Sequence, residues 1–216
     1  GHFFKCGGCT LQHWKFKKYK TWKFNKVSSA IFKLSSNTNV RPIITSSLKS
    51  RRHAKFIAKK TAATTIIGFN EYRSNFITQI NECIILDEKL VKLINNIEEP
   101  LNNLLRIGET IHIHANLLDN GIDLLIDGLK KVSFNKFTDL NETLLQNNVI
   151  RFSRKSNDKT IDLLFITGKT SLSNKLFSST VYPPPGGFLQ ATFEGENAIV
   201  NNTINALKNV NKTRLI

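Results

Sequence analysis

Apolar side chains recur along the chain with two different periods, and each period predicts a different kind of element. Residues 10–34 carry apolar groups near helical spacing between lysines, which predicts one long basic amphipathic helix. Residues 51–60 alternate instead, which predicts a strand with a basic face. One side of this strand is expected to hold Arg52, Ala54, Phe56 and Ala58.

The rest of the chain continues this mixture of strands and helices. The run 119–121 has the residue types of a tight hairpin turn, and the run 68–70 predicts another turn. Further strands are expected at residues 63–68, 110–118, 122–126, 149–152 and 160–166. Further helices are expected at residues 87–97, 137–146 and 193–208. The predicted fold class is therefore α+β, with a largely antiparallel mixed sheet and flanking helices.

Three prolines followed by two glycines, at residues 183–187, form the strongest break in this pattern and predict a domain boundary. The helix expected after the break has Thr192 as its candidate N-cap. The chain is thus expected to divide into four parts. They are a cysteine loop at residues 1–11, a basic helix and loop at 12–43, a central α+β domain at 44–185 and the start of a further domain at 186–216.

Charge is distributed very unevenly along the 216 residues. The net charge is +15, and the first sixty residues contain fifteen Lys and Arg but no Asp or Glu, which leaves sixteen basic and sixteen acidic residues in the remainder. A block of this kind predicts a strongly positive face, for which a nucleic-acid backbone is the usual partner. The alternative is a compositional bias that fills exposed positions with lysine.

The sequence also bears on where the protein works. It has no apolar stretch of about 18 residues that could cross a membrane, and its opening residues do not resemble a signal peptide. We therefore expect a cytoplasmic protein with no membrane partner; a monomer is expected separately. Because the chain lacks methionine and opens abruptly before a cysteine motif, both of its ends are expected to be cuts.

The candidate chemistry lies in three cysteines, Cys6, Cys9 and Cys83. An odd number argues against a closed set of disulfides and favours metal chemistry or free thiols. Cys6 and Cys9 form a Cys-x-x-Cys pair whose two intervening glycines allow backbone N–H groups to point at sulfur. By itself such a pair fits half a zinc site, a redox pair or part of an iron–sulfur site.

The segment from Cys6 to His13, followed by Tyr19 and Trp22, resembles the cysteine motif of the iron–sulfur RNA (uracil-5-)methyltransferases. The family pattern places a further cysteine immediately before Gly1, and Cys83 matches the family's last cluster ligand. The resemblance therefore implies a 4Fe-4S cluster held by Cys6, Cys9 and Cys83 together with that preceding cysteine. The alternative for Cys83 is a small buried thiol without a metal.

The same resemblance extends over the whole chain and assigns further roles. Phe188 and Gln190 match family residues that line the site where the target uracil meets S-adenosylmethionine, whereas Thr192 replaces the family's usual Asn. RNA contacts are expected from Arg51, Arg52, Lys15 and Lys18. Residues 186–216 then correspond to the first helix of a truncated Rossmann-like methyltransferase domain, and residues 44–185 to a central RNA-binding domain.

The activity implied is methylation of C5 of a uridine, expected in 23S ribosomal RNA. The family's nucleophilic cysteine, general-base glutamate and glycine-rich cofactor loop have no counterpart here, so no catalytic residue is expected within the chain. Two alternatives remain open, namely an inactive RNA-binding remnant of a split or truncated gene and a zinc-binding RNA-associated protein. His112 and His114 could form a metal pair but are better explained as exposed polar positions of a hairpin.

Overall fold

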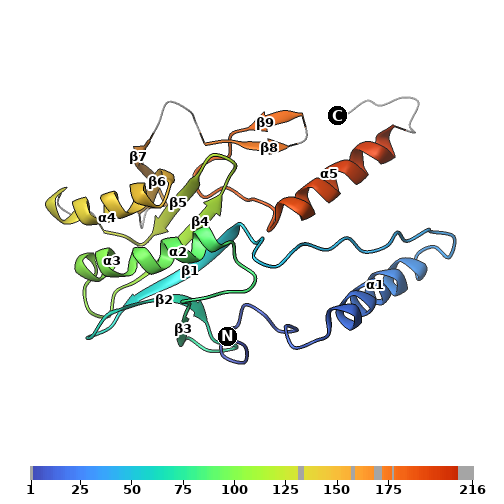
Figure 1. The fold of residues 1–216 in the computed structure, drawn as a ribbon, viewed down its shortest axis with the longest axis horizontal. Helices are drawn as coiled ribbons and strands as arrows, with labels where there is room; N and C mark the ends of the chain where they lie inside the picture. The colour runs from blue at the N-terminus through green and yellow to red at the C-terminus, as the bar shows by residue number, and fades with distance from the viewer. Residues whose placement is uncertain (1, 131–133, 157–158, 168–171, 177, 209–216) are drawn as a thin grey trace.

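The computed structural model is built around one seven-stranded sheet with three helices packed against it, while two further helices extend away from this body (Figure 1). The sheet strands are β1 (His53–Lys60), β2 (Thr65–Asn70), β3 (Ile77–Gln79), β4 (Thr110–Leu117), β5 (Ile122–Asp127), β6 (Val149–Lys155) and β7 (Ile161–Ile166). The helices are α1 (Phe16–Phe32), α2 (Glu88–Asn96), α3 (Glu98–Leu104), α4 (Phe134–Gln146) and α5 (Phe193–Leu207). The structure describes residues 2–130, 134–156, 159–167, 172–176 and 178–208.

The strands lie in the order β3-β2-β1-β4-β5-β6-β7. Every neighbouring pair is antiparallel except β5 and β6, which run parallel and are joined through α4, since a parallel pair requires a crossover. A separate hairpin is formed by β8 (Asn174–Leu176) and β9 (Ser179–Val181). These observations confirm the predicted α+β class with a mostly antiparallel sheet.

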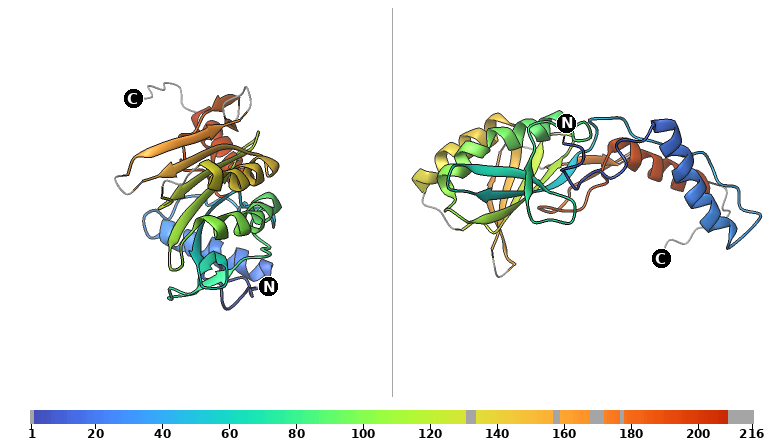
Figure 2. Two further views of the ribbon diagram at one scale, coloured as in Figure 1. Left: turned by 90° about the vertical axis from the view of Figure 1, so that its left-hand side faces the viewer. Right: turned by 90° about the horizontal axis from the view of Figure 1, so that it is seen from below.

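The hydrophobic core lies on one face of the sheet, because α2, α3 and α4 all cover the same side (Figure 2). In β1 this side receives Ala54, Phe56 and Ala58, whereas Lys55 and Lys59 are exposed on the other. The predicted alternation of this strand is thereby confirmed. The helices contribute fully buried leucines to the core, namely Leu90, Leu93, Leu101, Leu140 and Leu144. We call the side of β1, β4 and β5 that faces away from these helices the open face.

Several local predictions are confirmed by the structure. The hairpin of β4 and β5 turns at residues 118–121, where the backbone N–H of Leu118 donates to Gly121 O at 2.9 Å. The helix predicted for residues 87–97 is present as α2, and Asp87, which was not predicted as a cap, accepts from Lys89 N at 2.9 Å as its N-cap. Helix α5 begins after Thr192, whose Oγ1 accepts from Gly195 N at 3.1 Å, as expected of a helix N-cap.

Two predictions were wrong. Residues 68–70 are not a turn but the end of β2, and the turn follows at 71–76. Gly68 is needed there because a Cβ atom would lie 1.8 Å from Thr78 O of the paired strand β3. The long helix predicted for residues 10–34 is shorter, because α1 spans only Phe16–Phe32 and residues 10–15 form turns.

Helix α1 also differs from the expected amphipathic helix in how it is buried. Ser28 is its one buried residue, whereas Phe16, Val27 and Phe32 are at least half exposed. Figure 1 shows the helix standing apart from the sheet. In the described part of the chain, no helix is long and apolar enough to cross a membrane. Residues 209–216, at the end of the predicted fourth part, lie outside the described residues.

Candidate functional site

The Cys6–Cys9 loop is attached to the sheet through backbone hydrogen bonds. Cys6 forms an antiparallel bridge with Glu71, and Gly7 N donates to Asn70 O at 2.9 Å. A Cβ atom on Gly7 would lie 2.8 Å from that same carbonyl oxygen, so this close approach requires glycine. Gly8 N in turn points at Cys6 Sγ, at 3.4 Å. The loop is thus fixed beside the end of β2.

Cys83 lies in the loop between β3 and α2, and this loop is attached to the sheet from another direction. Leu86 forms a parallel bridge with Arg51, and Arg51 N donates to Ile85 O at 2.9 Å. Leu86 N points at Cys83 Sγ, at 3.5 Å. Two separate loops therefore bring half-buried thiols against the same hydrophobic core, since Cys6 and Cys83 both pack on it.

The three thiols lie close enough to influence one another. Burial raises the pKa of Cys9, and the neighbouring Cys83 and Cys6 raise it further, whereas the guanidinium of Arg51 lowers it. All three cysteines are free of disulfides. Their soft sulfur atoms, each loop supplying a backbone N–H donor, suit a thiolate-bound metal centre. Within the described residues, however, no group of three or more His, Cys, Asp and Glu side chains is arranged to hold a metal ion.

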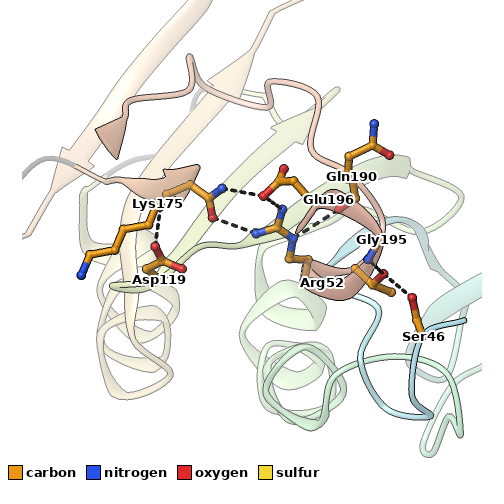
Figure 3. A network of polar contacts seen from close by, with 9 residues as sticks. Ser46, Arg52, Asp119, Lys175, Gln190, Gly195 and Glu196 are labelled. Atoms are coloured by element: carbon orange, nitrogen blue, oxygen red, sulfur yellow. Dashed lines mark hydrogen bonds and ion pairs between the residues drawn. The ribbon is translucent and has the colours of Figure 1, made fainter. Parts of the chain in front are cut away.

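Arg51 and Arg52 have opposite environments. Arg51 is partly exposed, and its Nε donates to His53 O at 3.0 Å beside the cysteines. Arg52 is only 1% exposed and lies at the centre of a polar network (Figure 3). Its guanidinium donates to Asn174 Oδ1 at 2.7 Å and to Gln190 O at 3.2 Å. The same group pairs with Glu196 Oε2 at 2.8 Å.

The Arg52 network joins the sheet to the chain that enters α5. Arg52 N donates to Ala191 O at 2.8 Å, and its guanidinium carbon lies 3.8 Å from the centre of the Phe193 ring. Asn174 Nδ2 donates to the same Glu196 oxygen at 3.0 Å, so the buried carboxylate has two partners. Arg52 therefore lies inside the protein, where its guanidinium is unavailable to RNA phosphates, and we correct the RNA-contact role expected for it.

The remaining predicted site residues are exposed to different degrees. Phe188 is 78% exposed and Gln190 is partly exposed, while Leu189 between them is buried. Lys15 and Lys18 are exposed at the start of α1. Three later lysines of that region lie over aromatic rings of the helix, for example Lys23 Nζ at 4.8 Å from the centre of the Tyr19 ring. Among the described residues, the hollow beside the cysteine loop is lined by Gly7 and Gly8 but by no residue of α1 or of the segment 188–190.

The sequence did not predict the polar side chains that fix the Pro-Gly segment 183–187 against the open face by hydrogen bonds. Gly186 N donates to Asp123 Oδ2 at 2.9 Å, and Asn116 Nδ2 donates to Gly187 O at the same distance. Asp123 also pairs with Arg151, whose Nη1 donates to Pro183 O at 2.9 Å. A signal was present in Asn116 and Asp123, which are polar residues at positions of strongly apolar strands.

His112 and His114 lie on the open face of β4, where the register places them opposite Ile57 and Lys55 of β1. Burial lowers the pKa of both histidines, and the positive charge of Lys55 lowers it further, against an opposing effect of Asp127. These surroundings favour the uncharged form of both imidazoles. They are half-buried rather than fully exposed, which modifies the expectation of exposed hairpin positions.

Comparison with known proteins gives the class of fold first. The chain superposes on the crystal structure of Pyrococcus abyssi tRNA (uracil-54, C5)-methyltransferase in complex with S-adenosyl-L-homocysteine, with a TM-score of 0.66 and 17% identity. The match covers 96% of this chain and 51% of that one. The fold is therefore shared with that protein. No family model matches the sequence.

Sequence relatives then indicate a more particular likeness. The chain is 30% identical over 200 residues to an uncharacterized RNA methyltransferase of Brucella melitensis, covering 92% of this chain and 46% of the relative. It is 28% identical over 211 residues to the 23S rRNA (uracil(1939)-C(5))-methyltransferase RlmD of Shewanella woodyi, covering 94% and 47%. The chain thus spans about half the length of the curated relatives it matches.

The Arg52 network gives a first prediction. Replacing Arg52 with Met leaves the carboxylate of Glu196 buried without its cation, which should lower the free energy of unfolding by about 3 to 5 kcal/mol. Urea denaturation followed by circular dichroism measures this. The double variant R52M/E196L should recover much of the loss, because it removes both charges. The exposed pair Lys49 and Glu88 provides the control, and Lys49→Ala should leave the unfolding midpoint unchanged.

Cys9 gives a pH prediction. Because its pKa is raised, its alkylation by iodoacetamide should be slow at neutral pH and accelerate as the pH rises. Arg51→Met removes the group that lowers this pKa, so the midpoint of the rate profile should move to higher pH. Mass spectrometry of the peptide containing Cys9 follows the reaction. Arg41→Met is the control, since Arg41 pairs with Asn202 of α5. A shift to lower pH in the Arg51 variant would contradict the assignment.

Proposed function

We propose that the whole protein transfers a methyl group from S-adenosylmethionine to C5 of a uridine in RNA, with ribosomal RNA as the substrate. The observation that carries this proposal is the 30% identity over 200 residues to an RNA methyltransferase. Two further findings support it. One relative is named for a uracil of 23S ribosomal RNA, and the solved structure with the shared fold is a uracil methyltransferase holding S-adenosyl-L-homocysteine.

Within this activity, the described chain has the role of holding RNA. Lys15, Lys18 and Arg51 offer cations for phosphate contacts, and all three belong to the first sixty residues, where acidic side chains are absent. The nucleophile and the general base are assigned to parts of the whole protein outside these 216 residues. On the present assignment the protein acts as a cytoplasmic monomer.

Cys6, Cys9 and Cys83 are proposed as ligands of a 4Fe-4S cluster, completed by a cysteine that precedes Gly1. Two observations support this assignment: Cys6 and Cys83 lie near enough to Cys9 to raise its pKa, and backbone N–H groups point at the sulfurs of Cys6 and Cys83. When bound, the cluster would supply a structural cross-link between the two cysteine-bearing loops. The guanidinium of Arg51 lowers the pKa of Cys9 and so favours the thiolate of that residue.

Phe188 and Gln190 are proposed to face the target uracil and the cofactor. Their side chains reach solvent, while the backbone between them is held by the buried Leu189 and by the bond from Arg52 to Gln190 O. Such a segment combines a fixed backbone with available side chains, which is what positioning a base requires. This assignment extends to the fourth predicted part, residues 186–216, as the start of the methyltransferase domain.

The proposed activity predicts that the whole protein, given S-adenosylmethionine and a ribosomal RNA transcript, produces 5-methyluridine, detected by mass spectrometry of the digested RNA. Gln190→Ala should reduce kcat/KM at least tenfold by removing a contact to base or cofactor. Gln146→Ala, at the far end of α4, is the matched control and should leave the rate unchanged. If the protein binds the RNA but no 5-methyluridine is formed, the alternative of an inactive RNA-binding remnant is supported instead.

The proposed cluster predicts brown protein with broad visible absorbance after anaerobic purification. Cys83→Ser should abolish that absorbance because it removes a thiolate ligand. Ile84→Ser, a polar change at the exposed neighbouring position, should retain it and so controls for disturbance of the loop. Colourless protein that contains zinc by elemental analysis would establish the zinc-binding alternative. Unchanged absorbance in the Cys83 variant would show that another group completes the site.

A further inference from the structure

A groove that the assignments above do not use lies between the cysteine loop and the turn that follows β2. It is lined by Gly7 and Gly8 of the cysteine loop and by Lys55 and Ile57 of the open face. The end of β2 and residues 71–73 complete the lining. A second hollow adjoins it past Arg73 and extends the concave surface along the turn to Asn75.

The side chains lining this groove combine an aromatic ring with positive charge. Tyr72 is 60% exposed, and the guanidinium carbon of Arg73 lies 5.2 Å from the centre of its ring. Lys55, which also lines the groove, has an exposed side chain. Glu71 is the one carboxylate lining the groove in the described structure, and its Oε1 accepts from Thr78 Oγ1 at 3.4 Å. The lining therefore carries a positive balance, which fits an anionic partner.

The turn that presents Tyr72 is held in one conformation. Glu71 N donates to Phe76 O at 2.9 Å, and Phe76 N donates to Ser74 Oγ at 3.0 Å. Arg73 has a φ of +54°, in the left-handed region that arginine rarely adopts. Because the backbone of this turn is already fixed by hydrogen bonds, stacking a ligand on Tyr72 costs little backbone conformational entropy, which favours binding.

We propose that this groove binds a single-stranded segment of the RNA substrate, with one base stacked on Tyr72 and the neighbouring phosphates at Arg73 and Lys55. The inference rests on the proposed function, which supplies RNA as the partner. A duplex is a poor occupant, because its bases are already stacked on one another and their faces are covered. An unpaired base offers a free face for the tyrosine ring, and its backbone offers phosphates for the two cations.

The test compares binding of a labelled single-stranded RNA with binding of the same sequence as a duplex, by fluorescence anisotropy over a range of salt concentrations. Tyr72→Ala should weaken single-strand binding about tenfold without changing the salt dependence, because it removes stacking and no charge. Tyr72→Phe keeps the ring and should bind as the unaltered protein does. Tyr182→Ala, at an equally exposed tyrosine (65%) outside the groove, should have no effect.

The cations are tested by their salt dependence. Lys55→Ala should reduce the slope of log affinity against log salt by about one, because one phosphate contact is lost. Arg73→Asn removes the guanidinium but tolerates the positive φ, so its weaker binding cannot come from backbone strain. Lys92→Ala, on the helix-covered side of the sheet, is the control and should leave the slope unchanged.

Two outcomes would overturn the groove assignment, and they differ in what they say about the proposed function. If the protein binds single-stranded RNA but Tyr72→Ala behaves as Tyr182→Ala does, the RNA lies elsewhere and the RNA-binding role remains. If the unaltered protein binds neither RNA, both the groove and the proposed function fail. RNA containing 4-thiouridine gives an independent readout, since its cross-link is expected on the peptide that carries Tyr72.

Discussion

The buried ion pair of Arg52 and Glu196 is the interaction on which the arrangement of this chain depends. It joins the residue that leads into β1, an interior strand of the sheet, to the first turn of α5, and the two partners lie 144 positions apart along the chain. Burying both charges is costly unless each has several partners. Asn174, Gln190 and Phe193 meet this requirement, so the entry of α5 has one well-defined position against the sheet.

The cysteine site depends on backbone pairing instead of side-chain ion pairs. The loop of Cys6 and Cys9 is hydrogen-bonded beside the end of β2, and the loop of Cys83 is hydrogen-bonded to Arg51, just before β1. The distance between the two loops therefore depends on how β1 and β2 pair in the sheet. The two loops lie near each other, since Cys83 and Cys6 both contribute to raising the pKa of Cys9. The proposed cluster would therefore have to draw the three thiols together from loops whose backbones are already fixed to the sheet.

Much of the fold could be predicted because hydrophobic alternation and turn chemistry are local signals. The hairpin of β4 and β5 and the cap at Thr192 depend only on neighbouring residues. The error at residues 68–70 has a different origin. A glycine there suggests a turn, but it is present because strand β3 approaches within contact distance, which is a tertiary fact.

The difference between local signals and tertiary contacts also explains why Arg51 and Arg52 were given the same role from the sequence. Strand alternation placed Arg52 on the side of Ala54 and Phe56, and that pattern was right, but its charge suggested a surface role. Its partner Glu196 is too far along the chain for any periodicity to reveal. Since consecutive residues of a strand face opposite sides, Arg51 beside it points away from this network and toward the thiols, where it lowers the pKa of Cys9. One dipeptide thus serves both the joint with α5 and the cysteine site, and a one-residue shift of β1 would abolish both functions together.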